Sequence, residues 1–222
     1  MGVGGGALGR FWHSTIGKKI VMAVTGVLLV AFIIGHALGN LIVFRGAEAF
    51  NAYAALLKRN VNLLWMVRAG LIVAAVLHIV TALQLTRRQQ SARPVDYARR
   101  DPQVSTLASR TIRWGGVLLL VFLVYHLLHL TTGSLHPSFS HTDAYRNVIV
   151  GFGVWWVALV YIVAMGALGL HLYHGVWSSI RTLGLARPSH QPLKRRAALV
   201  IALGVTIAFV AIVTAVAAGF VR

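Results

Sequence analysis

Five apolar runs, each long enough to cross a lipid bilayer, divide the chain. A helix rises about 1.5 Å per residue, so about 20 apolar residues span the hydrocarbon core. Lipid offers the backbone no hydrogen-bond partners, so such runs must form helices that bond internally. The sequence therefore predicts an all-α, multi-pass membrane protein with a five-helix bundle. Its expected parts are a segment over 1–19 and a membrane domain over 20–222, with spans over roughly 20–44, 63–85, 112–132, 148–180 and 197–221.

Two of these runs have features of their own. The first run is followed by no small-residue cleavage pattern, so we interpret it as a permanent span and not as a signal peptide. The fourth run is too long to end at both membrane surfaces, which predicts a helix that projects beyond one of them. The loop after the first run contains a stretch typical of a short interfacial helix, FRGAEAFNAYAALLKRN.

The charge distribution predicts which way the chain crosses the membrane. The formal net charge is +17, from 21 basic and only 4 acidic residues. Most basic residues flank one side of the predicted spans: Arg10, Lys18, Lys19, Arg87, Arg88, Arg93, Arg99, Arg100, Arg110, Arg113, Arg181, Arg187, Lys194, Arg195 and Arg196. The positive-inside rule places that side, with the N-terminus, in the cytoplasm and the C-terminus outside. We therefore assign the charge to topology, lipid contact and an acidic partner protein, and we expect no nucleic acid partner.

Cysteine is absent, which excludes whole classes of chemistry from this chain. Disulfides, thiolate-bound iron–sulfur clusters and cysteine nucleophiles all need a residue that the sequence lacks. A redox role would have to use another kind of ligand.

Histidines supply that alternative, because six of the ten lie inside predicted spans. Ionisable side chains inside a membrane usually mark a functional site. The six are His36, His78, His126, His129, His171 and His174, whereas His13, His136, His141 and His190 fall in loops or termini, where we expect solvent to satisfy them.

Depth sorts four of the span histidines into two pairs. On the rise of a helix, His36 and His126 lie about 25 Å and about 22 Å from the cytoplasmic starts of their spans. The second and fourth spans run the other way, and His78 and His171 stop about 12 Å and about 15 Å short of the inner ends. One pair therefore lies toward the outer surface and the other toward the cytoplasm.

Two imidazoles at one depth can supply both axial bonds to a haem iron between two helices. Such ligation leaves no open position on the iron and suits electron transfer. Two haems are the favoured interpretation. A single haem, a proton or metal-ion pathway, and simple polar contacts remain open, although a pathway usually also uses carboxylates and no predicted span contains one. Arg113 and Arg181, at the inner ends of the third and fourth spans, are candidates to pair with haem propionates.

His129 and His174 each follow a candidate ligand by three residues and so share its helix face. Small residues in the first and fourth spans would let helices, or a flat macrocycle, approach closely. They are Gly26, Gly35, Gly39, Gly166 and Gly169.

Four motifs carry a resemblance to a known family. They are GHALGNL at 35–41, RGAEAFN at 45–51, VLHIVTALQL at 76–85 and GLHLYHGVWSSIRTLG at 169–184. With them, the chain resembles the five-helix, two-haem cytochrome b membrane anchor of succinate dehydrogenases and fumarate reductases, from about Gly17 to its end. VYHLLHL at 124–130 fits the pattern more loosely, which leaves the choice of His126 over His129 as the least specific of the four ligand positions.

The resemblance implies the ligands and the rest of an enzyme complex. His78 and His171 match the ligands of the haem nearer the cytoplasm, and His36 and His126 match those of the distal haem. It implies two haems b, a flavoprotein subunit carrying FAD, an iron–sulfur subunit on the cytoplasmic face, and a quinone, usually menaquinone, as electron partner. The dicarboxylate chemistry would lie on the flavoprotein subunit, and the complex would serve the tricarboxylic acid cycle and respiratory chain in a bacterial inner membrane, with or without a further small membrane subunit.

Two other interpretations remain at this stage. The chain would instead be a haem b subunit of another quinone-linked dehydrogenase, such as a formate dehydrogenase or hydrogenase, or a transporter that uses the histidines as a relay. RGAEAFN and the count of five spans argue against the first, and the lack of acidic residues in the spans argues against the second.

Overall fold

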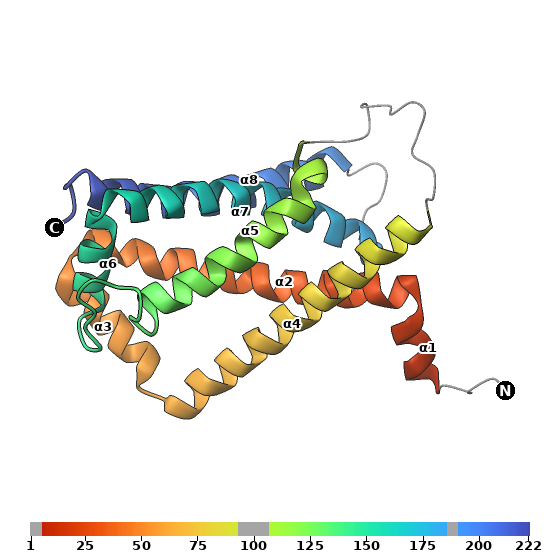
Figure 1. Cartoon of the computed structure of the whole chain (residues 1–222), viewed down its shortest axis with the longest axis horizontal. Coiled ribbons are helices and arrows are strands. Elements are labelled where there is room, and N and C mark those ends of the chain that lie inside the picture. Colours follow the sequence, from red (N-terminus) through yellow and green to blue (C-terminus); the bar gives the residue numbers. More distant parts are fainter. Residues whose placement is uncertain (1–5, 93–106, 186–190) are drawn as a thin grey trace.

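The computed structural model describes residues 6–92, 107–185 and 191–222, and within these ranges every regular element is a helix (Figure 1). Five helices are long and apolar enough to cross a membrane, which confirms the predicted all-α membrane fold. They are α2 (Thr15–Asn40), α4 (Val61–Ser91), α5 (Leu107–Leu130), α7 (Trp155–Thr182) and α8 (Gln191–Ala217). The shorter elements are α1 (Ala7–His13), the 3₁₀ helix η1 (Leu41–Arg45), α3 (Ala47–Lys58) and α6 (Ala144–Gly153).

Polar side chains cap the N-termini of three of these helices, α2, α4 and α6. Ser14 accepts a hydrogen bond from the backbone N–H of Gly17 at the start of α2, and Asn60 does the same for Leu63 at the start of α4. Asp143 caps α6. Short polar side chains satisfy first-turn N–H groups that have no partner inside the helix.

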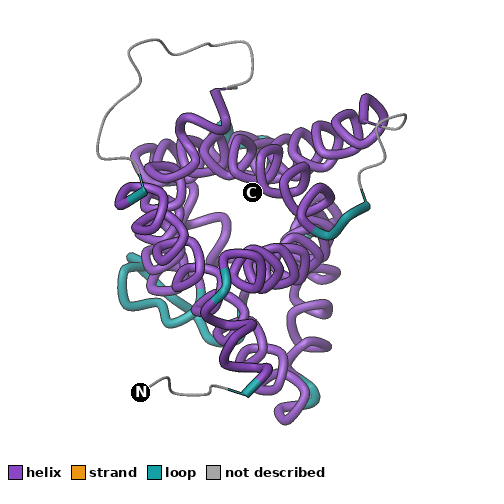
Figure 2. Tube along the Cα trace, turned by 90° about the vertical axis from the view of Figure 1, so that its right-hand side faces the viewer, coloured by secondary structure: helices purple, strands orange, loops and turns teal. Residues whose placement is uncertain are grey.

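The long helices form a ring when viewed from the end of the bundle (Figure 2). α2 packs against α4, α7 and α8, and α7 packs against α5 and α8. α4 crosses α2 near the end of the bundle that holds α1 and diverges from it toward α3 (Figure 1). Among the described helices, α4 and α7 form no packed backbone interface, and neither do α2 and α5.

Two apolar clusters hold the bundle together, and both lie mainly on α7 and α8. One joins η1, α3 and α6 to those helices, through Val43, Phe50, Val148, Phe152, Val157, Tyr161, Ile212, Val213 and Val216. The other joins α7 to α8 through Leu172, Ala202 and Val205, and Val30, Ile33 and Ile34 of α2 pack against it. Gly169 lets α7 and α8 approach closely, because a Cβ there would lie 2.5 Å from Thr206 Oγ1. This glycine therefore serves helix packing and not space for a macrocycle.

α3, α6 and the loop before α6 form a cap over one end of the bundle, which we call the outer cap after the orientation predicted from the sequence. Asn51 donates a hydrogen bond from its amide to Asp143 Oδ1 at 2.9 Å and accepts one from the backbone N–H of Tyr145 at 2.9 Å. α3 occupies the stretch in which a short interfacial helix is predicted.

The structure differs from the predicted fourth run, which is not one helix. Val154 has extended backbone angles, φ −85° and ψ 111°, and divides the run into α6 and α7. Gly151 and Gly153 weaken the helix just before the break. As a separate helix, α6 packs its buried side chains Val148 and Phe152 into the apolar cluster with η1 and α3. α7 alone, with 28 residues, is about 42 Å long.

The inner connections lie partly outside the described residues. The segment 93–106, where Pro94 and Pro102 predict an interrupted chain, is not among them, and neither are 1–5 or 186–190. α1 was not predicted. Three hydrogen bonds attach it and the start of α2 to α4. Arg88 donates to the carbonyl oxygen of His13 and to Thr15 Oγ1, and the ammonium of the buried Lys18 donates to Gln84 Oε1.

Candidate functional site

Four span histidines meet in two pairs inside the ring of helices. The imidazoles of His78 on α4 and His171 on α7 have centroids 6.3 Å apart. Those of His36 on α2 and His126 on α5 have centroids 5.9 Å apart. These are the two pairs that depth alone predicts from the sequence.

The spacing in both pairs suits a metal ion bound in line between two imidazoles. A metal–imidazole nitrogen bond is about 2 Å long, so two opposed nitrogens lie about 4 Å apart and their ring centroids about 6 Å apart. Each pair also joins two helices whose backbones do not pack against each other. The histidine side chains therefore approach each other between helices whose backbones lie apart.

We call His78 and His171 the inner pair and His36 and His126 the outer pair, after their predicted depths. Contacts from α2 fix the ring of His78. Its Nδ1 lies 3.1 Å from the carbonyl oxygen of Met22 and 3.4 Å from Thr25 Oγ1. Because a carbonyl only accepts, Nδ1 carries the proton and Nε2 keeps the lone pair that a metal needs. Gly26 makes room for this ring, since a Cβ there would lie 3.2 Å from His78 Cε1.

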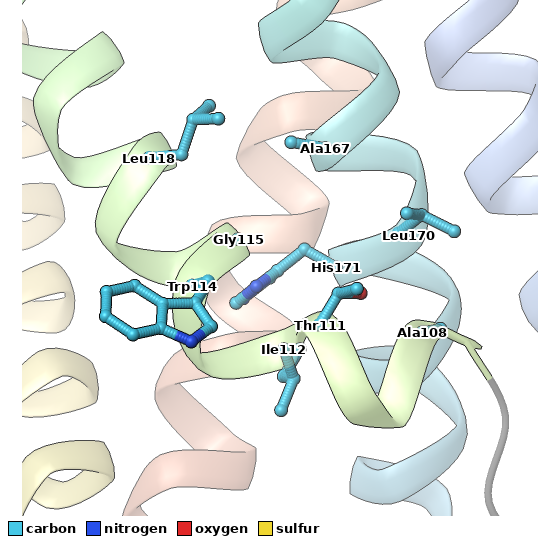
Figure 3. Close-up of a pocket in the computed structure, with 9 residues that line it drawn as sticks. All are labelled: Ala108, Thr111, Ile112, Trp114, Gly115, Leu118, Ala167, Leu170 and His171. Atoms are coloured by element: carbon cyan, nitrogen blue, oxygen red, sulfur yellow. The ribbon is translucent and has the colours of Figure 1, made fainter.

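His171 lies in an apolar hollow of about 230 Å³ between α5 and α7. Figure 3 shows its imidazole pointing from α7 toward α5, beside Gly115 and below Ala167. The hollow is lined by Ala108, Thr111, Ile112, Trp114, Gly115, Leu118, Ala167, Leu170 and His171. The Nδ1 atom of His171 is buried and has no hydrogen-bond partner among the described residues, so no such bond competes with a ligand for this ring.

A second hollow, of about 350 Å³ and mainly polar, adjoins the first at Ile112. It is lined by Gln89, Ser109, Arg110, Ile112, Arg113 and His174. Arg113 donates to Gln89 Oε1 at 2.9 Å, and His174 Nε2 lies 3.2 Å from Ser178 Oγ. Two guanidinium groups and no carboxylate in this lining suit an anionic partner.

The two arginines predicted as site residues are therefore placed differently. Arg113 lines the polar hollow next to the pocket of His171. Arg181 is exposed near the end of α7, with its guanidinium 6.0 Å from the centre of the Trp177 ring, and lines neither hollow. Arg110, which the sequence analysis did not select, takes its place there.

Aromatic side chains surround the outer pair. His36 stacks on Phe32, with centroids 5.5 Å apart, and lies 5.7 Å from Phe209 of α8. His126 lies 5.9 Å from Phe122, and its Nδ1 is 3.3 Å from the hydroxyl oxygen of Tyr161. A mostly apolar, aromatic wall of this kind suits a flat hydrophobic ligand.

His129, the neighbour that the sequence left as an alternative ligand, has different partners. It is fully buried and stacks between Tyr125 and His136, at 5.5 Å and 5.0 Å. Its Nδ1 lies 3.0 Å from the Tyr161 hydroxyl. The structure therefore brings His126, and not His129, to His36.

His136 corrects an expectation, because it is buried and not held by solvent. Its Nε2 lies 2.9 Å from the carbonyl oxygen of Asn147, and its Nδ1 accepts from the backbone N–H of Ser138 at 3.1 Å. The loop position gave no sign of this contact.

Tyr161 was also missed, because hydropathy does not tell which way a span tyrosine points.

The donor set fits haem better than a bare metal ion. No group of three or more histidine, cysteine or acidic residues that could hold a metal ion occurs among the described residues. Two imidazoles alone do not complete a coordination sphere, but they suffice for haem, whose macrocycle supplies the other ligands. The apolar hollow beside His171 and the basic polar hollow next to it also match a macrocycle that carries carboxylates.

Comparisons of the chain with protein-family models, with curated proteins and with solved structures found no match.

Proposed function

We propose that this chain is the two-haem cytochrome b membrane anchor of a succinate:quinone oxidoreductase. His78 and His171 would hold the inner haem, and His36 and His126 the outer one. The observation that carries the proposal is the meeting of four helices in two imidazole pairs, at 6.3 Å and 5.9 Å, across helix pairs that do not pack together.

The polar hollow supports a location for the propionates of the inner haem. Arg113 and Arg110 line it together with Gln89, and it adjoins the pocket of His171 at Ile112. Carboxylates bind guanidinium groups by charge-assisted hydrogen bonds. Arg181 is the weaker of the two predicted propionate partners, because it lies exposed on Trp177.

The chemistry supplied by bound haem is one-electron transfer, and bis-histidine ligation restricts it to that role. The chain's own contribution is to hold the two rings of each pair in place and to exclude water from them. Since the chain has no cysteine, iron–sulfur clusters and the flavin would belong to partner subunits. The basic inner ends of the spans would dock the iron–sulfur subunit on the cytoplasmic face.

The succinate-linked assignment rests on the motif resemblance. RGAEAFN spans η1 and the start of α3, and GLHLYHGVWSSIRTLG supplies His171. This resemblance supports menaquinone as the electron partner, a bacterial inner membrane as the location, and a cytoplasmic N-terminus. The same histidine pairs would also serve a haem b subunit of another quinone-linked dehydrogenase, so the electron donor must be tested directly.

A histidine-relay transporter has less support. The five long helices, from Thr15–Asn40 to Gln191–Ala217, contain no aspartate or glutamate. Proton and ion pathways in membranes usually depend on such carboxylates.

The deciding experiment is purification of the intact complex through a tag on this chain. A pyridine haemochrome assay should give two haems b per chain, and succinate should reduce them in an optical spectrum. Absence of haem would overturn the proposal. Haem that formate or hydrogen reduces, but succinate does not, would move the chain to another dehydrogenase.

A further inference from the structure

The hydroxyl group of Tyr161 lies between two histidines of one helix. Tyr161 belongs to α7 and is 5% exposed. Its oxygen lies 3.3 Å from Nδ1 of His126 and 3.0 Å from Nδ1 of His129, one turn further along α5. The contact to His126 is at the long end of the range for a hydrogen bond.

A phenol has one proton, so it can donate to only one of these two nitrogens. If His126 binds iron through Nε2, its Nδ1 carries a proton and must donate to the tyrosine oxygen. Tyr161 then donates its own proton to His129 Nδ1, which leaves the proton of His129 on Nε2. Ligation of iron thus sets one direction for the chain from His126 through Tyr161 to His129.

Rigid packing holds the far end of this hydrogen-bond chain. His129 is fully buried and lies stacked between Tyr125 and His136. Gly151 on α6 allows its close approach, because a Cβ there would lie 2.8 Å from His129 Cε1. His136 is itself held by the backbone carbonyl of Asn147 in the outer cap.

We propose that Tyr161 is a positioning residue for the outer haem, and that His129 is its anchor and not a ligand. With His126 bound through Nε2, the hydroxyl would accept a hydrogen bond from its Nδ1–H and hold its ring toward His36. This inference rests on the proposed function, since it concerns a ligand of the outer haem. The inference also goes beyond the proposed function, because it assigns His129 a role in setting the reduction potential of the outer haem.

The inner and outer pairs use different acceptors for the same purpose. His78 Nδ1 is held by the backbone carbonyl of Met22, whereas His126 Nδ1 is held by a phenol. A hydrogen bond from Nδ1–H makes an imidazole a stronger donor to its metal and so favours the oxidised iron. Loss of the acceptor should therefore raise the reduction potential. At the inner site the backbone carbonyl of Met22 would remain even if Thr25 were replaced, whereas Tyr161→Phe removes the phenol oxygen at the outer site.

The test is Tyr161→Phe in the intact complex, followed by a potentiometric titration of both haems. We expect two haems per chain, an upward shift in the midpoint potential of the outer haem, and no shift for the inner one. Tyr125→Phe is the matched control: the Tyr125 ring also contacts His129, but its buried hydroxyl has no hydrogen-bond partner among the described residues. This control should shift neither potential.

A second variant, His129→Phe, keeps Tyr161 but removes the acceptor of its proton. It should retain both haems and shift the outer potential in the same direction by less than Tyr161→Phe does. If Tyr161→Phe assembles poorly, this variant decides the question. A ligand role for His129 would instead appear as loss of the outer haem.

The results separate the inference from the proposed function. A wild-type complex without two haems would overturn both. A wild-type complex with two haems, in which neither Tyr161→Phe nor His129→Phe changes the outer potential, would overturn the positioning role alone.

Discussion

The imidazole of His78 lies 6.3 Å from that of His171, although the helices that carry them form no packed backbone interface. Among the described residues, α4 buries only Ala74, Thr81 and Leu85. The two imidazoles therefore approach each other where the helix backbones do not.

Replacing His171 should remove the inner haem and spare the outer one. His171→Ala deletes one of the two proposed axial ligands of the inner haem, whereas His36 and His126 are untouched. The haemochrome assay should fall from two haems to one per chain. His174→Ala is the matched control, because His174 lines the polar hollow beside the pair and should leave both haems in place. Loss of the inner haem in that control would show that His174, and not His171, is the ligand.

Gly26 should tolerate no side chain while the inner haem is bound. A Cβ at Gly26 would lie 3.2 Å from His78 Cε1 and 3.5 Å from its Nδ1, so Gly26→Val would displace the ring from Met22. We expect loss of the inner haem, or a changed low-spin spectrum for it. Gly116→Ala is the control, since its Cβ would meet His171 Cε1 only at 3.9 Å, an ordinary contact. Equal spectra for both variants would contradict the prediction.

Hydrogen exchange should show that α4 depends on the haem. α7 buries Val157, Ala158, Tyr161, Ala164, Met165 and Leu172, and it packs on α8. α4 has far less packing, so loss of the haem-mediated contact should affect it first. In nanodiscs, His78→Ala/His171→Ala should speed amide exchange in α4 more than in α8, as measured by mass spectrometry. A uniform increase along the chain would count against the prediction.

Asp143 should stabilise the outer cap in a pH-dependent manner. The N–H of Arg146, the amide of Asn51 and the nearby Arg146 charge hold the pKa of Asp143 below its ordinary value. A lowered pKa contributes stability that is complete above the unfolded value of about 4 and is lost as the pH falls toward the folded pKa. Asp143→Ala should cost about 1 kcal/mol in thermal unfolding at neutral pH, the usual value of an N-cap.

Asp143→Asn provides the control for the charge. Asparagine still caps a helix, so most of the stability at pH 7 should remain, and the acid-induced loss assigned to Asp143 should disappear. An unchanged acid profile in this variant would show that another carboxylate is responsible.

The proposed orientation can be mapped by single cysteines, because the chain has none of its own. Gln90 at the end of α4 and Leu57 in α3 are both exposed and lie at opposite ends of the bundle. In inside-out vesicles, a membrane-impermeant maleimide should label Gln90→Cys. In right-side-out cells it should label Leu57→Cys. The reverse pattern would place the N-terminus outside.

Sequence reasoning predicted much of the bundle, because some of its geometry is set by distance along the chain. The rise of a helix is constant, so the depths of His36, His78, His126 and His171 follow from counting residues. The pairs that share a depth are the pairs that the structure brings together. Their role as ligands stays a prediction until haem is measured.

The sequence did not predict features that depend on how each helix is rotated about its axis. Hydropathy does not reveal that Tyr161 points at His126, that His136 folds back under α6, or that Gly169 faces α8. The break at Val154 also escaped notice, because the second half of α6, residues 148–153, has no polar side chain and continues directly into the apolar start of α7. These features arise from tertiary packing, which a single sequence does not encode as a pattern.

The hydrogen bond between Asn51 and Asp143 has a consequence for how the protein is made. The two residues are 92 positions apart, with two complete spans between them. If the chain inserts in the proposed orientation, Asn51 reaches the outer surface before Asp143 does, and the outer cap can close only after the third span has crossed the membrane. The cap therefore reports a late stage of insertion, and a chain that stalls before Asp143 would leave α3 exposed to surface proteases.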